Sequence, residues 1–293
     1  MRERTRWHSA RRRTVWSAGA VAAVLIGGLV VRRGVVPAMQ VEHAELPRLE
    51  DVPSVAWESL TGLRVFFGHQ SVGYNVVAGL QQLLADNARI DLRIVETDRP
   101  DDYERPIFGH ARLGRNGDPR SKLDAFADLM EGGLAERVDI ALFKFCYVDI
   151  TARTDVVGLF ERYRQVMGAL RAKHPHTLFV HVTVPLCIVQ TGPKAWAKRV
   201  LGRGDNNLAR CRFNALLRKE YAGREPIFDL AEQEATATDG VRWSYPQDEC
   251  RVYALAPAFS SDGGHLNTVG SRAVAEQLLI TLGRAAVNLA RPE

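Results

Sequence analysis

A serine, an aspartate and a histidine stand where a nucleophile and its base could meet. Ser71 lies in the stretch Val-Phe-Phe-Gly-His-Gln-Ser-Val-Gly, after a short apolar run and before residues 72–84, whose apolar positions recur at helical spacing. A hydroxyl between a strand and a helix lies where open α/β proteins place ligands, and there the helix dipole favours developing negative charge. Alternatively, Ser71 serves only as the N-cap of that helix.

Asp262 and His265 stand near the other end of the chain, in Asp-Gly-Gly-His-Leu-Asn, before a helical pattern at residues 268–289. A serine nucleophile needs an imidazole as its general base, and the imidazole needs a partner that fixes its tautomer. One loop could supply both groups, although the segment alone is also typical of a turn followed by a helix cap. Together with Ser71, the two residues indicate nucleophilic attack on a carbonyl group.

The elements that must position these residues alternate between strands and helices. Five strands are expected at residues 65–67, 90–96, 138–145, 178–184 and 226–230, and five helices at residues 72–84, 121–130, 156–173, 207–221 and 268–289. Residues 97–120 are expected to form a long loop, and residues 190–206 and 231–258 look inserted. The fold class is therefore α/β, a three-layer αβα sandwich with a five-stranded parallel, flavodoxin-like sheet.

The order of these motifs resembles that of the SGNH/GDSL hydrolases, a family of serine esterases and lipases. The resemblance covers residues 60–285 and implies the same sandwich fold, without a metal or an organic cofactor. Carried over by motif, Ser71 is the nucleophile, His265 the base and Asp262 the acid that orients it. The first block differs from the common Gly-Asp-Ser-Leu motif, because His69 and Gln70 precede the serine.

The same resemblance implies an oxyanion hole of two or three hydrogen-bond donors. Family members use the N–H of the serine, a glycine N–H from a second block and an asparagine from a third block. Ser71 matches the serine of the first block. Gly117, which stands in the stretch Asn-Gly-Asp-Pro, matches the glycine of the second block. After the strand at residues 138–145 the chain reads Lys-Phe-Cys-Tyr-Val-Asp, without the asparagine. Losing one donor typically costs about 2.7–4 kcal/mol of transition-state stabilisation, so we expect Asn116 or, failing that, Tyr147 to replace it.

Several of these polar residues also have plain structural interpretations. Asp149 could simply cap the helix that follows it, and the Asn-Gly-Asp stretch beginning at Asn116 is a good turn on its own. His69 is a weaker candidate for the base than His265, since a tight turn rarely aims an imidazole at a hydroxyl two residues further on.

The N-terminus predicts a membrane anchor. Residues 14–31 carry no charge, and as a helix they would span about 27 Å, close to the hydrocarbon thickness of a bilayer. Six arginines precede this run and orient the amino end inward. We expect a basic cytoplasmic segment at residues 1–13, a transmembrane anchor at residues 14–31, a tether at residues 32–60 and a hydrolase-like domain at residues 61–293. Three consecutive arginines at residues 11–13 also allow an export signal of the twin-arginine type.

The net charge of +5 belongs to this N-terminal segment. Residues 1–33 carry eight arginines against one glutamate, so the remainder has a net charge of −2 and no sign of a nucleic-acid-binding face. The four cysteines lack the spacing of a zinc site. Outside the cytoplasm one disulfide is expected, between Cys211 and either Cys250 or Cys187, whereas Cys146 resembles a small buried hydrophobic residue.

Three functional hypotheses follow. The first is a single-pass, membrane-anchored serine esterase whose domain lies outside the cytoplasmic membrane, in the periplasm. Its partner would be an ester-bearing small molecule or an acylated glycan, for example one carrying O-acetyl groups. The second is an O-acyltransferase that uses the same triad on surface polysaccharide. The third, which the missing asparagine favours, is a catalytically inactive glycan-binding module.

Overall fold

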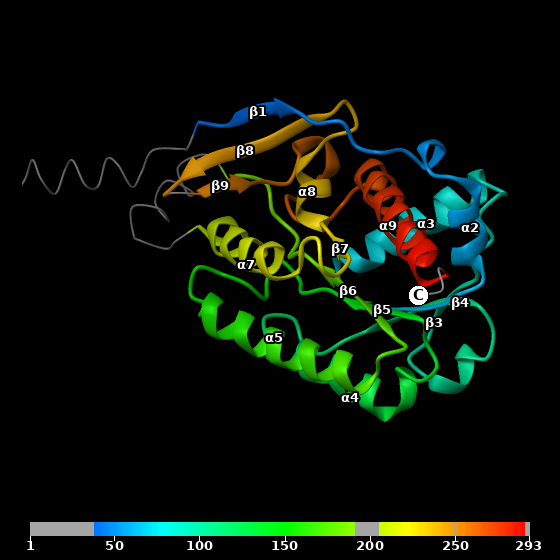
Figure 1. Cartoon of the computed structure of the whole chain (residues 1–293). Helices are drawn as coiled ribbons and strands as arrows, with labels where there is room; N and C mark the ends of the chain where they lie inside the picture. The colour runs from blue at the N-terminus through cyan, green and yellow to red at the C-terminus, as the bar shows by residue number, and fades with distance from the viewer. Residues whose placement is uncertain (1–37, 191–204, 249, 291–293) are drawn as a thin grey trace, which may run out of the picture. The chain divides into compact units, whose positions relative to one another are not determined.

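The computed structural model describes residues 38–190, 205–248 and 250–290 (Figure 1). They belong to one of the two units into which the chain divides, residues 37–190 with 204–293. The predicted cytoplasmic segment and the predicted anchor at residues 14–31 lie outside the described residues. Among the helices that are described, none combines the length and the apolar character needed to cross a bilayer.

A six-stranded parallel sheet lies at the centre, with the strand order β3-β4-β2-β5-β6-β7. Its strands are β2 (Arg64–His69), β3 (Ile94–Glu96), β4 (Ile107–Arg112), β5 (Ile140–Phe143), β6 (Leu178–Val182) and β7 (Ile227–Phe228). The α/β class and the parallel sheet are as predicted, but the expectation of five strands is wrong, because β4 lies inside the predicted loop at residues 97–120.

β4 escaped prediction because Gly109 and His110 interrupt its apolar run. A glycine is needed at this position, since a Cβ on Gly109 would lie 1.8 Å from the Tyr103 hydroxyl oxygen. The tyrosine itself is fully buried. A local pattern cannot reveal a glycine whose purpose is to admit a side chain from another segment.

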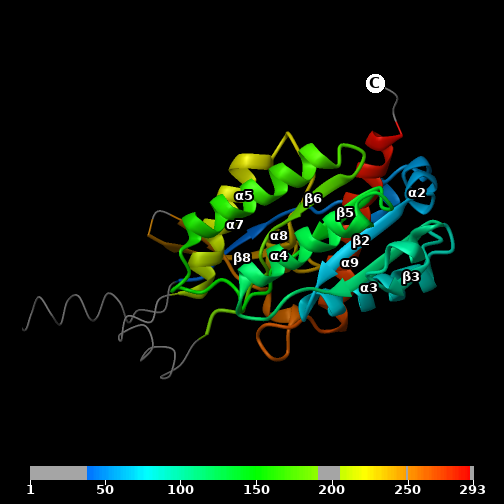
Figure 2. The same ribbon diagram turned by 90° about the horizontal axis from the view of Figure 1, so that it is seen from below.

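Helices cover both faces of the sheet (Figure 2). Successive residues of β2 point to opposite faces, so Val65 and Phe67 pack in one core while Phe66 packs in the other. The first core contains α2 (Ser54–Thr61), α3 (Val72–Asp86), α8 (Leu230–Ala235) and α9 (Thr268–Leu289). The second contains α4 (Pro119–Leu129), α5 (Val156–Lys173) and α7 (Asn206–Tyr221). The predicted three layers are therefore present.

A second, antiparallel sheet was not predicted. It has the order β1-β8-β9 and consists of β1 (Gln40–His43), β8 (Val241–Gln247) and β9 (Cys250–Tyr253). β1 and all but the last residue of α2 fall within residues 32–60, the predicted tether, and both pack on the folded unit. The physical reason is burial: Trp57 and Leu60 of α2 join the core that α9 lines.

The sheet topology gathers three loops at one edge. β2 lies between β4 and β5, and all three strands run parallel. The loops that follow their carboxyl ends are therefore neighbours, which is the arrangement that makes ligand sites in open α/β sheets. These loops carry Ser71, residues 113–118 and residues 144–155.

Candidate active site

Ser71 does not cap the helix that it precedes. Its backbone has φ 53° and ψ −113°, a positive φ that is rare outside glycine, and its side chain makes no capping hydrogen bond. The hydroxyl lies 2.6 Å from His265 Nε2 instead. The interpretation of Ser71 as a plain cap is therefore wrong, and the strained turn presents a hydroxyl to an imidazole.

Asp262 orients that imidazole. Its Oδ2 lies 2.6 Å from His265 Nδ1, while its Oδ1 accepts the N–H groups of Gly264 at 2.9 Å and of His265 at 2.8 Å. These three hydrogen bonds hold the pKa of the Asp262 carboxyl well below its usual range. The carboxylate therefore keeps the proton of the neutral ring on Nδ1, which leaves Nε2 free to accept the proton of the Ser71 hydroxyl.

The packing of α3 against α9 brings the two ends of the chain together. Ser71 stands immediately before α3 and His265 three residues before α9. The Leu266 N–H donates to Asn75 Oδ1 at 3.3 Å, which fixes the histidine loop on the first turns of α3. The Asp262 and His265 side chains remain 55% and 44% exposed.

Tyr147 lies beside the base. Its ring packs edge-on against the His265 imidazole, with 5.6 Å between ring centroids, and it fills the space that a Cβ on Gly264 would need. The Arg210 guanidinium lies over the same ring and donates to the Tyr147 carbonyl at 2.9 Å. The structure thus places Tyr147 against the histidine loop, where it restricts the imidazole.

The expected oxyanion donors lie in different environments. The Gly117 N–H donates to Asp149 Oδ1 at 2.7 Å, so that donor is already engaged. The Ser71 N–H has no acceptor in the part of the chain that the structure describes. Asn116 is exposed, its Oδ1 accepts a hydrogen bond from Lys122 at 2.8 Å, and no described residue accepts from its Nδ2. Among the described residues, the Ser71 N–H and the Asn116 Nδ2 therefore make no hydrogen bond that would occupy them.

His69 and Gln70 hold the loop around the serine. Burial, with the nearby Lys144 and His110, lowers the pKa of His69 to about 2, so this ring stays neutral and cannot serve as a base in water near pH 7. Its Nε2 lies 3.1 Å from His110 Nδ1. The Gln70 amide donates to the carbonyls of Leu113 and Gly114, which ties the serine turn to the loop after β4.

Two buried charged residues, Lys122 and Asp149, were missed as parts of the site. Asp149 does not cap a helix, since its carboxylate is buried and pairs with Lys122. The helical spacing of Lys122 and Phe126 did hold a signal, because both lie on the buried face of α4.

No group of three or more His, Cys, Asp or Glu side chains is placed to hold a metal ion in residues 38–190, 205–248 and 250–290. All four cysteines carry free thiols in the structure.

No family model matches the chain, and no curated protein matches it. Among solved structures, it is similar to a lipase/acylhydrolase from Enterococcus faecalis, with 12% identity, 76% of this chain and 97% of the other covered, and a TM-score of 0.42. It is also similar to the acetyl xylan esterase AlAXEase, with 16% identity, 74% and 98% covered, and a TM-score of 0.41. A structure described as a GDSL-like lipase from Parabacteroides merdae matches with 14% identity, 78% and 99% covered, and a TM-score of 0.44.

With identities between 12% and 16% and TM-scores below 0.5, these structures assign no function to the chain, whose own site geometry is described above.

Proposed function

We propose that this chain is a serine esterase of the SGNH/GDSL type that hydrolyses acyl esters. The observation that carries the proposal is the continuous chain of two short hydrogen bonds from Ser71 through His265 to Asp262, each 2.6 Å long. The three residues come from opposite ends of the sequence and meet at the carboxyl edge of the sheet. A nucleophile, a base and a group that orients the base are thus within reach of one another.

The geometry supports a two-step acyl transfer. Ser71 Oγ attacks the ester carbonyl carbon while His265 Nε2 takes the hydroxyl proton, and Asp262 stabilises the imidazolium. The tetrahedral oxyanion accepts hydrogen bonds from the Ser71 N–H and the Asn116 amide. When the C–O bond to the alcohol breaks, His265 returns the proton to the leaving oxygen, and the acyl group stays on Ser71. Water, deprotonated by His265, then releases the carboxylic acid and regenerates the serine.

The test is covalent labelling of the nucleophile. Full-length protein is treated with a fluorophosphonate probe, and the labelled peptide is identified by mass spectrometry alongside initial rates of p-nitrophenyl acetate hydrolysis. Wild type should label at Ser71, Ser71→Ala should not label, and His265→Ala should lose roughly 10⁶-fold in kcat. A folded wild-type protein that never labels would overturn the esterase proposal and favour the glycan-binding hypothesis.

An open site fits an ester carried on a large molecule, so we propose an acylated glycan as the substrate class. The support is the exposure of the His265 and Asp262 side chains, which leaves the base accessible from solvent. Release of acetate from an acetylated polysaccharide, compared with p-nitrophenyl acetate, tests this. If acyl groups pass to added sugar faster than to water, the protein is a transferase with the same triad.

We also propose that residues 14–31 anchor the enzyme in the cytoplasmic membrane with its domain outside. The support comes from the uncharged run and from the arginines before it. Membrane fractions washed at alkaline pH should retain the protein, and protease added to spheroplasts should digest the domain. Recovery of the intact protein in the soluble fraction would contradict the anchor.

A further inference from the structure

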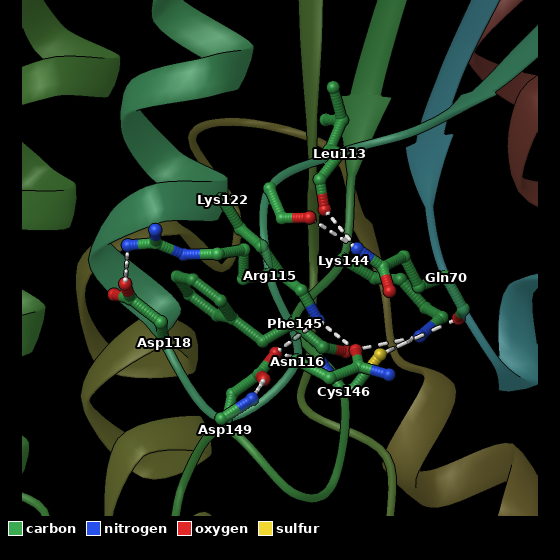
Figure 3. A network of polar contacts seen from close by, with 12 residues as sticks. Gln70, Leu113, Arg115, Asn116, Asp118, Lys122, Lys144, Phe145, Cys146 and Asp149 are labelled. Atoms are coloured by element: carbon green, nitrogen blue, oxygen red, sulfur yellow. Dashed lines mark hydrogen bonds and ion pairs between the residues drawn. The ribbon is translucent and has the colours of Figure 1, made fainter.

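A buried ion pair lies beneath the loops of the active site. Lys122, on α4, and Asp149, in the loop after β5, have side chains with 0% exposure, and their charged atoms are 2.6 Å apart. Figure 3 shows Lys122 extending from its helix toward Asp149 and Asn116. Burying two charges is costly, and apolar residues of similar size are often equally stable in such positions. The pair therefore calls for a role besides stability.

The Asp149 carboxylate joins two of the loops. Its Oδ1 accepts the Gly117 N–H at 2.7 Å, and its Oδ2 accepts the Cys146 N–H at 2.6 Å. It thereby holds the loop after β4 against the loop after β5, and it occupies the N–H that the family resemblance assigns to the oxyanion. A donor lost at Gly117 must be supplied by another group.

Lys122 fixes the orientation of that other group. Besides Asp149, its ammonium donates to Asn116 Oδ1 at 2.8 Å. An ammonium has only donors, so the amide cannot turn its NH2 toward Lys122 without setting donor against donor. The oxygen of Asn116 therefore faces inward, and Nδ2 is the end left for a substrate.

Asn116 is also linked to the nucleophile. The Gln70 amide, directly before Ser71, donates to the carbonyls of Leu113 and Gly114 at 2.7 Å and 2.6 Å. Only Arg115 separates Gly114 from Asn116, so the Asn116 amide lies on the loop that is tied to Gln70, the residue before the serine (Figure 3).

We propose that Lys122, with its charge balanced by Asp149, is a positioning residue that holds the Asn116 amide so that Nδ2 donates to the oxyanion formed at Ser71. The inference rests on the proposed esterase function. In this proposal Asn116, from the second block, replaces the missing third-block asparagine as a hydrogen-bond donor. Lys122 holds Asn116 in place and does not touch the substrate.

The experiment is a double-mutant cycle on the full-length enzyme. Asn116→Ala, Lys122→Met and the double variant are compared with wild type by kcat and KM for p-nitrophenyl acetate. Each single variant should lose roughly 10²–10³-fold in kcat with little change in KM, as expected for a donor that acts only in the transition state. The double variant should be no slower than the slower single variant, because Lys122 acts only through Asn116.

Controls separate positioning from folding. Lys173→Met makes the same substitution at an exposed lysine of α5 and should leave kcat unchanged. Urea unfolding and circular dichroism report whether Lys122→Met is folded. If it is not, Lys122→Met is combined with Asp149→Asn, which leaves no lone buried charge, and the cycle is repeated from that background with and without Asn116→Ala.

Either of two results would overturn the inference: wild-type kcat in folded Lys122→Met, or losses that multiply in the double variant. The proposed function fails differently, through a wild type that neither labels at Ser71 nor hydrolyses the ester. An enzyme that labels normally while Asn116→Ala keeps full kcat retains its function but refutes the role of Lys122.

Discussion

Ser71 holds a backbone conformation that its side chain does not favour. With φ 53° and ψ −113°, it is one of two non-glycine residues with positive φ among the described residues. Neighbouring hydrogen bonds impose the conformation, since the Gly73 N–H donates to the Gln70 carbonyl and the Tyr74 N–H to the Ser71 carbonyl. Such strain persists where the surroundings over-determine it, and here the result is a hydroxyl aimed at His265.

A comparison of two inactive variants should reveal this strain. Ser71→Ala removes the hydroxyl and keeps the Cβ, whereas Ser71→Gly also removes the Cβ that disfavours the positive φ. We expect Ser71→Gly to be more stable than Ser71→Ala by about 1 kcal/mol, the relief of strain less the entropy that glycine loses on folding. Urea unfolding of both variants measures the difference, and a less stable Ser71→Gly would refute the strain.

At the residue scale, the sequence was informative where the partners are local. Asp262 and His265 are three residues apart, and Ser71 stands at a strand–helix junction that apolar spacing reveals, so local patterns singled out each residue. The pairing of Ser71 with His265, 194 residues away, came from the family resemblance. The direction of the Gly117 N–H could not be predicted from the sequence, because its acceptor Asp149 is 32 residues away. A capping role for Asp149 stayed open as an alternative, since a buried carboxylate and a capping carboxylate look alike in sequence.

At the scale of elements, the contact between α3 and α9 sets the distance between nucleophile and base. Gly79 makes the close approach feasible, because a Cβ there would lie 2.1 Å from the Ser271 carbonyl oxygen. That oxygen belongs to the backbone of α9 and cannot move aside without moving the helix. The spacing of Ser71 and His265 therefore depends on a glycine two turns into α3.

Gly79→Ala should push the two helices apart. We expect a loss of about 1–3 kcal/mol in the free energy of unfolding, the usual cost of overpacking, together with a lower kcat as the gap between Ser71 and His265 widens. Gly168→Ala is the matched control, because Gly168 lies on an exposed part of α5 with no atom within 4 Å of the added Cβ.

The control should behave in the opposite way. Alanine is the better helix former, so Gly168→Ala should gain about 0.5–1 kcal/mol and keep full activity. Thermal unfolding and ester hydrolysis of both variants provide the measurement. Equal stabilities for the two variants would show that the helices do not depend on Gly79.

Elements were predictable where their apolar pattern is long. Five helices of the sandwich, α3, α4, α5, α7 and α9, and five of its strands follow from periodicity, whereas the shorter α2 and α8 were not predicted. β4 was not predicted because Gly109, which makes room for Tyr103, and His110, which lies beside His69, interrupt its apolar pattern. β1 was lost because only Val41 of its four residues is apolar, and its pairing with β8 spans 200 residues of sequence.

At the scale of the whole molecule, residues 38–61 behave as part of the folded unit. β1 completes the antiparallel sheet, and Trp57 lies 3.0 Å from the position of a Cβ on Gly283 of α9. The Gln277 amide donates to the Pro47 carbonyl at 2.7 Å. Of residues 32–60, predicted to form a tether, those that make these contacts therefore belong to the folded unit.

Trp57→Ala should confirm that this segment stabilises the domain. The indole is buried against α9, so we expect a loss of about 3–5 kcal/mol, a large part of the stability of an ordinary domain. A chain that begins at residue 38 should keep the wild-type unfolding midpoint, whereas one that begins at residue 62 should lose cooperative unfolding. Equal midpoints for the two shortened chains would show that residues 38–61 add no stability.

Two buried groups, Glu234 and His69, should make the free energy of unfolding depend on pH. Burial raises the pKa of Glu234 from 4.5 to about 8, against the nearby charges of Lys144 and Arg210. Between these values the folded chain holds a proton that the unfolded chain has released, so the contribution of Glu234 is full below pH 4.5 and is lost as pH rises toward 8. His69, shifted from 6.5 to about 2, acts in the other direction and weakens the fold as pH falls below 6.5.

Glu234→Gln separates the two effects, because glutamine resembles the protonated acid and can still accept the Leu186 N–H that now bonds to Glu234 Oε2. Relative to wild type, we expect the variant to gain roughly 2–4 kcal/mol between pH 5 and pH 8, since each unit of pKa shift corresponds to about 1.4 kcal/mol. Urea unfolding at several pH values measures this gain, with exposed Glu104→Gln as the control. The decline below pH 6.5 should persist in Glu234→Gln, because His69 causes it. Parallel pH curves for Glu234→Gln and wild type would mean that Glu234 is already ionised in the folded chain.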